Sequence, residues 1–495
     1  MCRHVARALA RRSNRSLTFA SLALLPVIAL LVSSGEARAA TKNKTSVETS
    51  ASVSLGRELF LHRWTPGDSH SRDGDGLGPM FNERSCVACH SQGGIGGAGL
   101  EKHNVEVISI SKSAVQQRQS NPAAVHPGLA LNSSVVLHRS SLADGYDIWR
   151  SVRLGESRDS RTQTQILQRQ CLPTSTPIPT LRKFDSQTPV EEVFASLQVN
   201  QSCDIRTTAV SEVNPPSLFG MGLIDALPNR AFEIAVRRSG ERFAQTQGRI
   251  ARLPDGRIGR FGWKASKATL AEFTSQACAV ELGLEVPTHP QVNDPRNMNA
   301  VAKGLDLNKY DCDSLTAFVH HLPRPEQQTI QQMDRAQREG QRLFANIGCA
   351  DCHQPNMGKI VGIYSDLLLH NMSAIGSAGG YGTTIRKLES KSDKLAKRGR
   401  RPAIEVAEAE WRTPPLWGCA DSAPYWHDGR APTLQVAIAL HGGQARASAQ
   451  KFKELSTEAQ GNLLAFLQTM HAPITAERAP PEEVEPTDDQ IASVE

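Results

Sequence analysis

Beyond its first 32 residues, the 495-residue sequence lacks a long apolar run, so we expect the mature chain to be water-soluble. It also lacks a strong excess of one charge: 56 basic residues face 50 acidic ones, and part of the net +6 comes from arginines near the N-terminus. This balance gives no case for nucleic-acid binding. Hydrophobic residues at 39% and charged residues at 21% are ordinary for a folded chain of two or three domains.

The two ends of the chain differ from the rest. Several arginines precede an apolar run from about Leu17 to Val32, and Ala37-Arg38-Ala39 offers a cleavage site. Residues 1–39 therefore read as a secretory signal peptide, and we expect a periplasmic protein that meets a membrane only through an uncleaved leader. Residues 479–495 are rich in Pro, Glu and Asp, which predicts a disordered acidic tail.

The sequence contains two copies of the pentapeptide Cys-x-x-Cys-His, at Cys86–His90 and Cys349–His353. In each, two thiols can attach one haem and the adjacent histidine can bind its iron, which predicts two covalent c-type haems. A zinc ribbon would need the cysteine pairs close together, but 349 − 86 leaves 263 positions between them. A redox dithiol would not require a histidine beside both second cysteines. The predicted cofactor-binding residues are Cys86, Cys89, His90, Cys349, Cys352 and His353, with His90 and His353 as the iron ligands.

Five cysteines remain beyond these pairs and the leader. In an oxidising compartment, sequence proximity suggests disulfides between Cys171 and Cys203 and between Cys278 and Cys312. Cys419 is left over, and we expect it to be a small buried residue.

The chain also repeats a set of landmarks in the same order. Each set holds a helix before the pentapeptide, a double proline and a late apolar helix, which predicts two cytochrome c-like haem modules in tandem. The fold class is therefore mainly α, with domains over 50–325 and 326–473. The matching segments are Gly56–Phe60 and Gly340–Phe344, Asn214–Gly220 and Thr413–Gly418, and Leu315–Val319 and Leu464–Leu467.

The first module is the longer one. Its haem histidine lies 215 − 90 = 125 residues before its double proline, against 414 − 353 = 61 in the second module. We expect this extra material to be loop-rich, with a strand at Val135–Leu137 and a loop at Cys171–Thr180. In the second module, the pattern predicts helices over Gln327–Ala345 and from the Ser456 cap through Leu467.

Several longer segments resemble the bacterial di-haem cytochrome c peroxidases, and most closely their di-haem oxidoreductase branch, often labelled peroxidase or thiol oxidoreductase. The resemblance runs through roughly residues 53–473 and implies periplasmic redox chemistry. The segments that carry it are Asp73–Asn82, Leu218–Ala226, Gly259–Ala265, Tyr364–Met372, Trp411–Gly418, Pro424–Leu434 and His441–Gly443.

At one ligand position this sequence differs from the peroxidases it resembles. The peroxidases usually place a methionine ligand of the electron-accepting haem six residues before the proline that aligns with Pro414, but this chain has Glu408 there. Loss of a thioether ligand would lower the potential of that haem. The candidate substitutes are His370, Met372, His427 and His441, and the sequence does not choose among them.

Peroxide cleavage needs a group that moves a proton between the two oxygens. Asp225 is the candidate catalytic residue, and the simpler interpretation is that it caps a helix or pairs in a salt bridge. His103 is a second polar candidate for the proton transfer. Trp263 is a candidate electron bridge or a packing residue. The run Asp68–Asp75 is rich in oxygen ligands and suggests calcium, but it lacks the closing glutamate of a twelve-residue calcium loop.

Three functions follow from these patterns. The first is reduction of hydrogen peroxide, or another small substrate, with electrons from a small donor such as a c-type cytochrome. The second is electron transfer without substrate chemistry, which the large first module disfavours. The third is oxidation or oxygenation of an organic substrate, which the missing methionine keeps open.

Overall fold

The computed structural model describes residues 50–110, 126–130, 134–154, 208–325, 328–372, 406 and 409–480. Several sequence predictions concern segments outside these ranges. They are the leader at 1–39, the loop at Cys171–Thr180, the Cys171–Cys203 pairing, Glu408, and the tail beyond residue 480.

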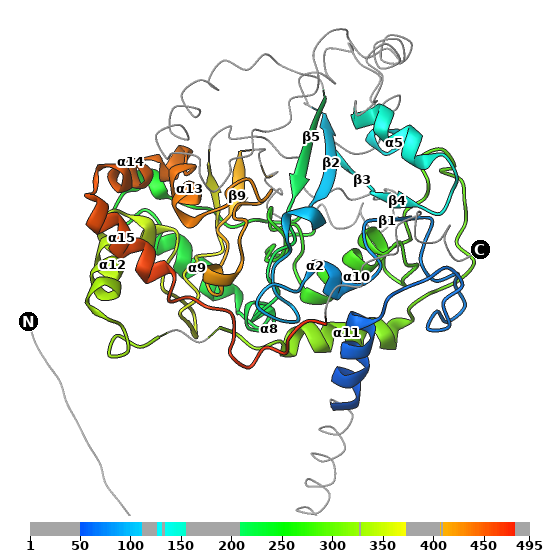
Figure 1. The fold of residues 1–495 in the computed structure, drawn as a ribbon, viewed down its shortest axis with the longest axis horizontal. Coiled ribbons are helices and arrows are strands. Elements are labelled where there is room, and N and C mark those ends of the chain that lie inside the picture. Colours follow the sequence, from blue (N-terminus) through cyan, green and yellow to red (C-terminus); the bar gives the residue numbers. More distant parts are fainter. Residues whose placement is uncertain are drawn as a thin grey trace, which may run out of the picture. The chain divides into compact units, whose positions relative to one another are not determined.

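The described part of the chain is mainly helical with short strands, as predicted (Figure 1). A first helix covers residues 50–61. Of the helices in the described part, none has both the length and the apolarity that a bilayer span requires. The other α-helices are α2 (Cys86–Cys89), α5 (Tyr146–Leu154), α8 (Met221–Asp225), α9 (Asn229–Arg238), α10 (Leu270–Glu281), α11 (Lys309–His321), α12 (Arg335–Asn346), α13 (Leu434–Ala439), α14 (Arg446–Glu454) and α15 (Thr457–Leu467).

Shorter helical turns and strands connect these helices. The 3-10 turns are η1 (Glu101–His103), η2 (Pro127–Ala130), η4 (Ala244–Thr246), η5 (Cys349–Asp351), η7 (Cys419–Asp421) and η8 (Gly443–Ala445). The strands are β1 (Met80–Phe81), β2 (Val105–Ile110), β3 (Ser134–Leu137), β4 (Ser140–Ser141), β5 (Thr208–Val213), β6 (Asn356–Met357), β7 (Ile360–Val361), β8 (Leu369–Asn371) and β9 (Glu410–Arg412).

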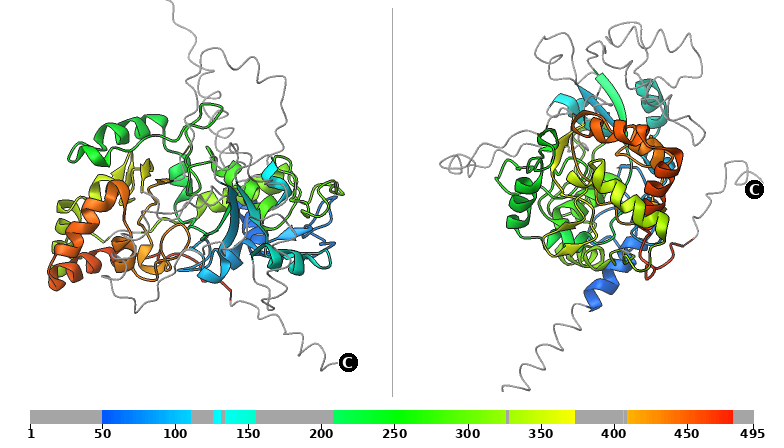
Figure 2. Two further views of the ribbon diagram at one scale, coloured as in Figure 1. Left: turned by 90° about the horizontal axis from the view of Figure 1, so that it is seen from above. Right: turned by 90° about the vertical axis from the view of Figure 1, so that its left-hand side faces the viewer.

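The largest sheet in the described part belongs to the expanded region before the first double proline. Strand β2 lies between β3 and β5 and is antiparallel to both, with Val107 opposite Val136 on one side and Ser211 on the other (Figure 2). Valine is common in these strands because its branched side chain packs well on a pleated surface. The strand predicted at Val135–Leu137 is confirmed as β3.

Two pairs of helices cross in the same way at matching landmarks. The helix 50–61 meets α11 where Gly56 lies against the Ser314 backbone, and α12 meets α15 where Gly340 lies against the Asn462 backbone (Figure 1). A Cβ on either glycine would lie 1.9 Å from the opposing carbonyl oxygen. The glycines therefore permit both close crossings, and the repeated sequence landmarks have matching surroundings.

The aromatic residue four positions after each glycine also has matching contacts. Phe60 lies 5.2 Å from Phe318 and 6.4 Å from His90 between ring centroids. Phe344 lies 5.5 Å from Phe466 and 6.4 Å from His353. Each helix pair therefore supports one pentapeptide histidine through one buried phenylalanine.

Helix α12, which precedes the second pentapeptide, begins later than predicted. The expected span was Gln327–Ala345, but α12 begins at Arg335. The Asp334 side chain accepts the Gln337 N–H while the Gln337 side chain bonds the Asp334 N–H, and this capping box sets the helix start. The cap predicted at Ser456 is confirmed, since its hydroxyl accepts the Ala459 N–H at the start of α15.

Cys278 and Cys312 do not form the disulfide suggested by their sequence proximity. Both are free thiols, on α10 and α11 respectively. The prediction rested on sequence separation, whereas a disulfide also requires the two Cβ atoms to point at each other. Cys419 is free and buried, as expected.

Candidate functional site

Each of the two pentapeptides lines a cavity. A cavity of about 270 Å³ is lined by Cys349, Cys352 and His353, and one of about 120 Å³ is lined by Cys86, Cys89 and His90. The structure thus places each set of predicted haem residues on one cavity. The cavities share part of their walls, formed by Asn214, Pro215, Pro216, Trp263 and Trp411.

Both pentapeptide histidines are held in the same orientation. His90 Nδ1 is 3.2 Å from the Gly97 carbonyl oxygen, and His353 Nδ1 is 3.0 Å from the Tyr364 carbonyl oxygen. A carbonyl can only accept, so Nδ1 carries the proton and Nε2 is the ligand nitrogen in each ring. Burial lowers the pKa of both histidines to about 4. Both rings are therefore neutral at pH 7, the form that binds iron.

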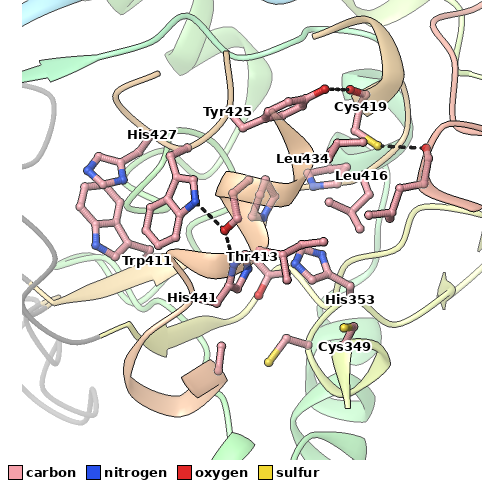
Figure 3. Close-up of a pocket in the computed structure, with 18 of the residues that line it drawn as sticks. Cys349, His353, Trp411, Thr413, Leu416, Cys419, Tyr425, His427, Leu434 and His441 are labelled. Carbon is pink, nitrogen blue, oxygen red and sulfur yellow. Dashed lines mark hydrogen bonds between the residues drawn. The ribbon is translucent and has the colours of Figure 1, made fainter. Parts of the chain in front are cut away.

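A second imidazole lies opposite His353. His441 lines the same cavity, and the two ring centroids are 6.4 Å apart (Figure 3). His441 follows α13, and its Nδ1 is 2.7 Å from the Ala437 carbonyl oxygen, which again leaves Nε2 as the ligand nitrogen. Burial also lowers the pKa of His441. The cavity thus offers two neutral imidazoles from segments far apart in the chain.

The other proposed substitutes for the missing methionine also line this cavity but have different surroundings. His370 Nε2 is 2.9 Å from Asp366 Oδ2 inside the protein. Burial alone would lower the pKa of His370, but the Asp366 carboxylate raises it to about 10. His370 is therefore a cation committed to Asp366, and it cannot offer a lone pair on that nitrogen.

His427 and Met372 complete the set. The His427 ring stacks on Trp411 with centroids 3.6 Å apart and planes at 23° (Figure 3). Burial lowers the pKa of His427 to about 3, so this ring is neutral. Met372 is half-buried, and its backbone N–H bonds the Ala409 carbonyl. Of the four candidates, His441 is the one whose ring lies against the ring of His353.

A buried cation lies on the same cavity. Arg412, on β9, is 3% exposed and donates to the carbonyl oxygens of Gly262 and Thr413. Burial lowers its pKa to about 10. An arginine held by neutral carbonyls can still bind a carboxylate strongly, because a buried charge gains most from an opposite charge.

The first cavity contains a carboxyl group that the sequence analysis missed. Glu281 ends α10 and lines the cavity beside Cys89 and His90. Its Oε2 accepts the Asn82 amide at 2.7 Å, while its buried Oε1 has no hydrogen-bond partner among the described residues. Burial raises the pKa of Glu281 to about 7. Such a group can take up and release a proton near neutral pH.

The predicted catalytic candidates lie elsewhere. Asp225 is not among the described residues lining either cavity, and its Oδ1 accepts the Leu270 N–H at the start of α10. His103 is buried with its Nδ1 2.7 Å from Glu83 Oε1, also away from the cavity linings. Trp263 lies in the shared wall and donates its Nε1–H to the Asn214 carbonyl at 3.0 Å. The sequence places Glu281 at the end of a helix that begins at the Thr269 cap, but it does not show which cavity that helix end reaches.

Comparison with known proteins agrees with the chemistry of the cavities. A family model described as "Di-haem oxidoreductase, putative peroxidase" matches residues 308–470. The resemblance to the di-haem oxidoreductases is confirmed. The matched region, about a third of the chain, includes the second pentapeptide, Arg412 and His441. The family implies haem cofactors and peroxidase-like oxidoreductase chemistry.

A curated relative is similar to part of the chain. The cytochrome c551 peroxidase of Pseudomonas aeruginosa is 26% identical over 141 residues, which are 28% of this chain and 34% of the relative. The match thus spans about a third of the length of that relative.

The solved structures are more distant. Hydrazine synthase of Kuenenia stuttgartiensis, pressurized with 20 bar xenon, shows 17% identity and a TM-score of 0.23, covering 60% of this chain and 98% of that chain. A MauG-like protein associated with microbial copper homeostasis shows 18% identity and a TM-score of 0.22, covering 50% and 90%. At these TM-scores the two likenesses say nothing about the activity of this chain.

Proposed function

We propose that the chain is a periplasmic oxidoreductase with two c-type haems, which reduces hydrogen peroxide with electrons from a small redox protein. The observation that carries the proposal is that the two cavities are chemically different. One offers two opposed neutral imidazoles, His353 and His441, and the other offers His90 together with a carboxyl group of raised pKa, Glu281. Two haems in one enzyme need such a division between electron transfer and reaction.

The residues fit two covalently held haems. Cys86 and Cys89 would carry one group and Cys349 and Cys352 the other, since these cysteines are free and line the cavities with their histidines. Arg412 suits a haem propionate, because it is a buried cation whose hydrogen bonds go to neutral carbonyls. Each set would form one cytochrome c-like module, in line with the matching helix crossings at Gly56 and Gly340.

His353 and His441 would together hold the iron of the haem in the second cavity. An iron–nitrogen bond is about 2 Å, and a ring centroid lies about 1 Å behind its nitrogen, so two imidazoles on one iron have centroids about 6 Å apart. The observed separation of 6.4 Å agrees with this. His441 would thus replace the thioether ligand that the sequence lacks at Glu408, and a haem held by two histidines would have a lower potential than one held by a histidine and a methionine.

In the first cavity, His90 would hold the iron and leave a position for substrate. Among the described residues lining this cavity, His90 is the one histidine. When bound, the haem supplies the electrons and the iron site for peroxide cleavage. Glu281 Oε1 would accept the proton of the peroxide oxygen that binds and return it to the leaving oxygen, since its pKa lies near neutral pH.

Trp263 and Trp411 stand in the wall shared by the cavities and would carry electrons from the second haem toward the first. The external donor would be a small protein such as a c-type cytochrome. The leader-like residues 1–39 favour export to the periplasm, where thiols are attached to haem.

The experiment is spectroscopic and uses the mature chain purified from a host that attaches haem. The proposal expects the mass of two added haems, one high-spin and one low-spin spectrum, and turnover of peroxide with a reduced cytochrome. Two low-spin haems inert to peroxide would point to an electron carrier, and peroxide reactivity without cytochrome turnover to an organic-substrate oxidase. Either result would overturn the proposal.

A further inference from the structure

A cluster of metal-ligating side chains lies outside both cavities, in the loop between the helix 50–61 and β1. The cluster contains His62, Asp68 and His70, each of which offers a ligand atom within 4.8 Å of the others. His62 Nε2 is 3.0 Å from both carboxylate oxygens of Asp68, and His70 Nδ1 is 3.4 Å from Asp68 Oδ1. The two imidazole rings lie 3.9 Å apart between centroids.

The nitrogen–oxygen distances at Asp68 suit a small divalent cation, and the two imidazole rings would move from 3.9 Å to about 5 Å apart on binding it. A tetrahedral site with bonds of about 2.0–2.1 Å has its ligand atoms about 3.3 Å from one another. The separations of 3.0 and 3.4 Å at Asp68 therefore need little adjustment, and the ion would take the place of the proton that His62 Nε2 donates to Asp68.

Glu58 orients one of the imidazoles from outside the cluster. His70 Nε2 is 3.2 Å from Glu58 Oε1, so Nε2 carries the proton donated to this carboxylate. The lone pair of His70 then sits on Nδ1, which is buried and has no hydrogen-bond partner among the described residues. A carboxylate that holds a histidine in this way is the usual outer support of a metal ligand.

The loop holds Asp68 in place without an ion. Asp68 accepts hydrogen bonds from the backbone N–H groups of Thr65 and His70, and its side chain is 4% exposed. His70 is 35% exposed, which leaves the cluster open to ions from solvent.

We propose that His62, Asp68 and His70 form a binding site for a divalent transition cation of the zinc type, separate from the haems. Two imidazoles and one carboxylate suit zinc, whereas calcium prefers six or more oxygen ligands. Asp73 and Asp75, which suggested calcium in the sequence, are exposed and lie outside the cluster. The site ties the end of the first helix to the loop that leads to the first pentapeptide.

Titration calorimetry of the metal-stripped, haem-loaded chain with zinc chloride tests the site. We expect one site per chain that His70→Gln weakens at least tenfold and that excess calcium does not block. Glu58→Gln should weaken it by about 10- to 100-fold. His471→Gln is the matched control, because His471 faces Asp421 at 3.2 Å on the surface and belongs to no metal-ligating cluster among the described residues, and it should leave zinc affinity unchanged.

The haem spectrum of each variant shows whether it is folded, and His62→Gln serves if His70→Gln fails that check. Absence of zinc binding by the parent chain would overturn the proposal. Equal loss in the His471 control, unchanged affinity in folded His62 or His70 variants, or displacement of zinc by calcium would also overturn it. Because the readout is zinc affinity, these outcomes do not depend on the peroxidase proposal.

Discussion

Gly340 on α12 lies so close to Asn462 on α15 that a Cβ would be 1.9 Å from the Asn462 carbonyl oxygen. Gly340→Ala should therefore force the helices apart and destabilise the protein by about 1–3 kcal/mol. Gly461→Ala on the same helix pair is the control. No atom of the described residues lies within 4 Å of its Cβ position, so a stabilisation of about 0.5–1 kcal/mol is expected from the better helix former. Denaturant unfolding of both variants checks this, and equal stabilities would contradict the close crossing.

The axial ligand assignment predicts a change at one haem only. His441→Ala should convert the second haem from low-spin to high-spin, and His441→Met should keep it low-spin at a higher potential. His427→Phe keeps an aromatic ring against Trp411 and should leave both spectra unchanged. Electron paramagnetic resonance and redox titration measure these outcomes. A low-spin second haem in His441→Ala would refute the assignment.

Glu281 should act as the proton-transferring group. Glu281→Gln is expected to lower kcat for peroxide by about 10²- to 10⁴-fold. The parent enzyme needs the ionised carboxylate to accept a proton, so its activity should rise with pH around 7. The variant should lose that inflection. Steady-state kinetics from pH 5 to 9 test both statements, with Asp225→Asn as the comparison that should keep kcat and the inflection.

The buried pair of His370 and Asp366 should govern stability at alkaline pH. The raised pKa of His370, about 10 against 6.5 when unfolded, means that the pair stabilises the fold fully below pH 6.5. This stabilisation should disappear as pH rises toward 10. Asp366→Asn leaves the histidine unpaired and should cost about 3–5 kcal/mol near neutral pH. Thermal unfolding against pH measures it, and an unchanged alkaline slope in the variant would argue against the pair.

Some of the fold follows from local patterns. Ser456 and the apolar spacing after it predict α15 because a cap and a helical repeat act over a few residues. The start of α12 was misplaced because the polar residues before Arg335 resemble a helix in composition, whereas the Asp334–Gln337 capping box sets the boundary. The repeated glycine and phenylalanine landmarks correctly pointed to matching surroundings, since close crossings constrain residue type.

The sequence alone determined which thiols and which histidine stand together in each pentapeptide, because their fixed spacing lies within five residues. It also determined the order of the repeated landmarks. Only the tertiary structure decided that His441 faces His353 and that Glu281 reaches the cavity of His90. These partners come from segments far away in the chain, and their nearness and shifted pKa values arise from packing and burial, which no local spacing encodes.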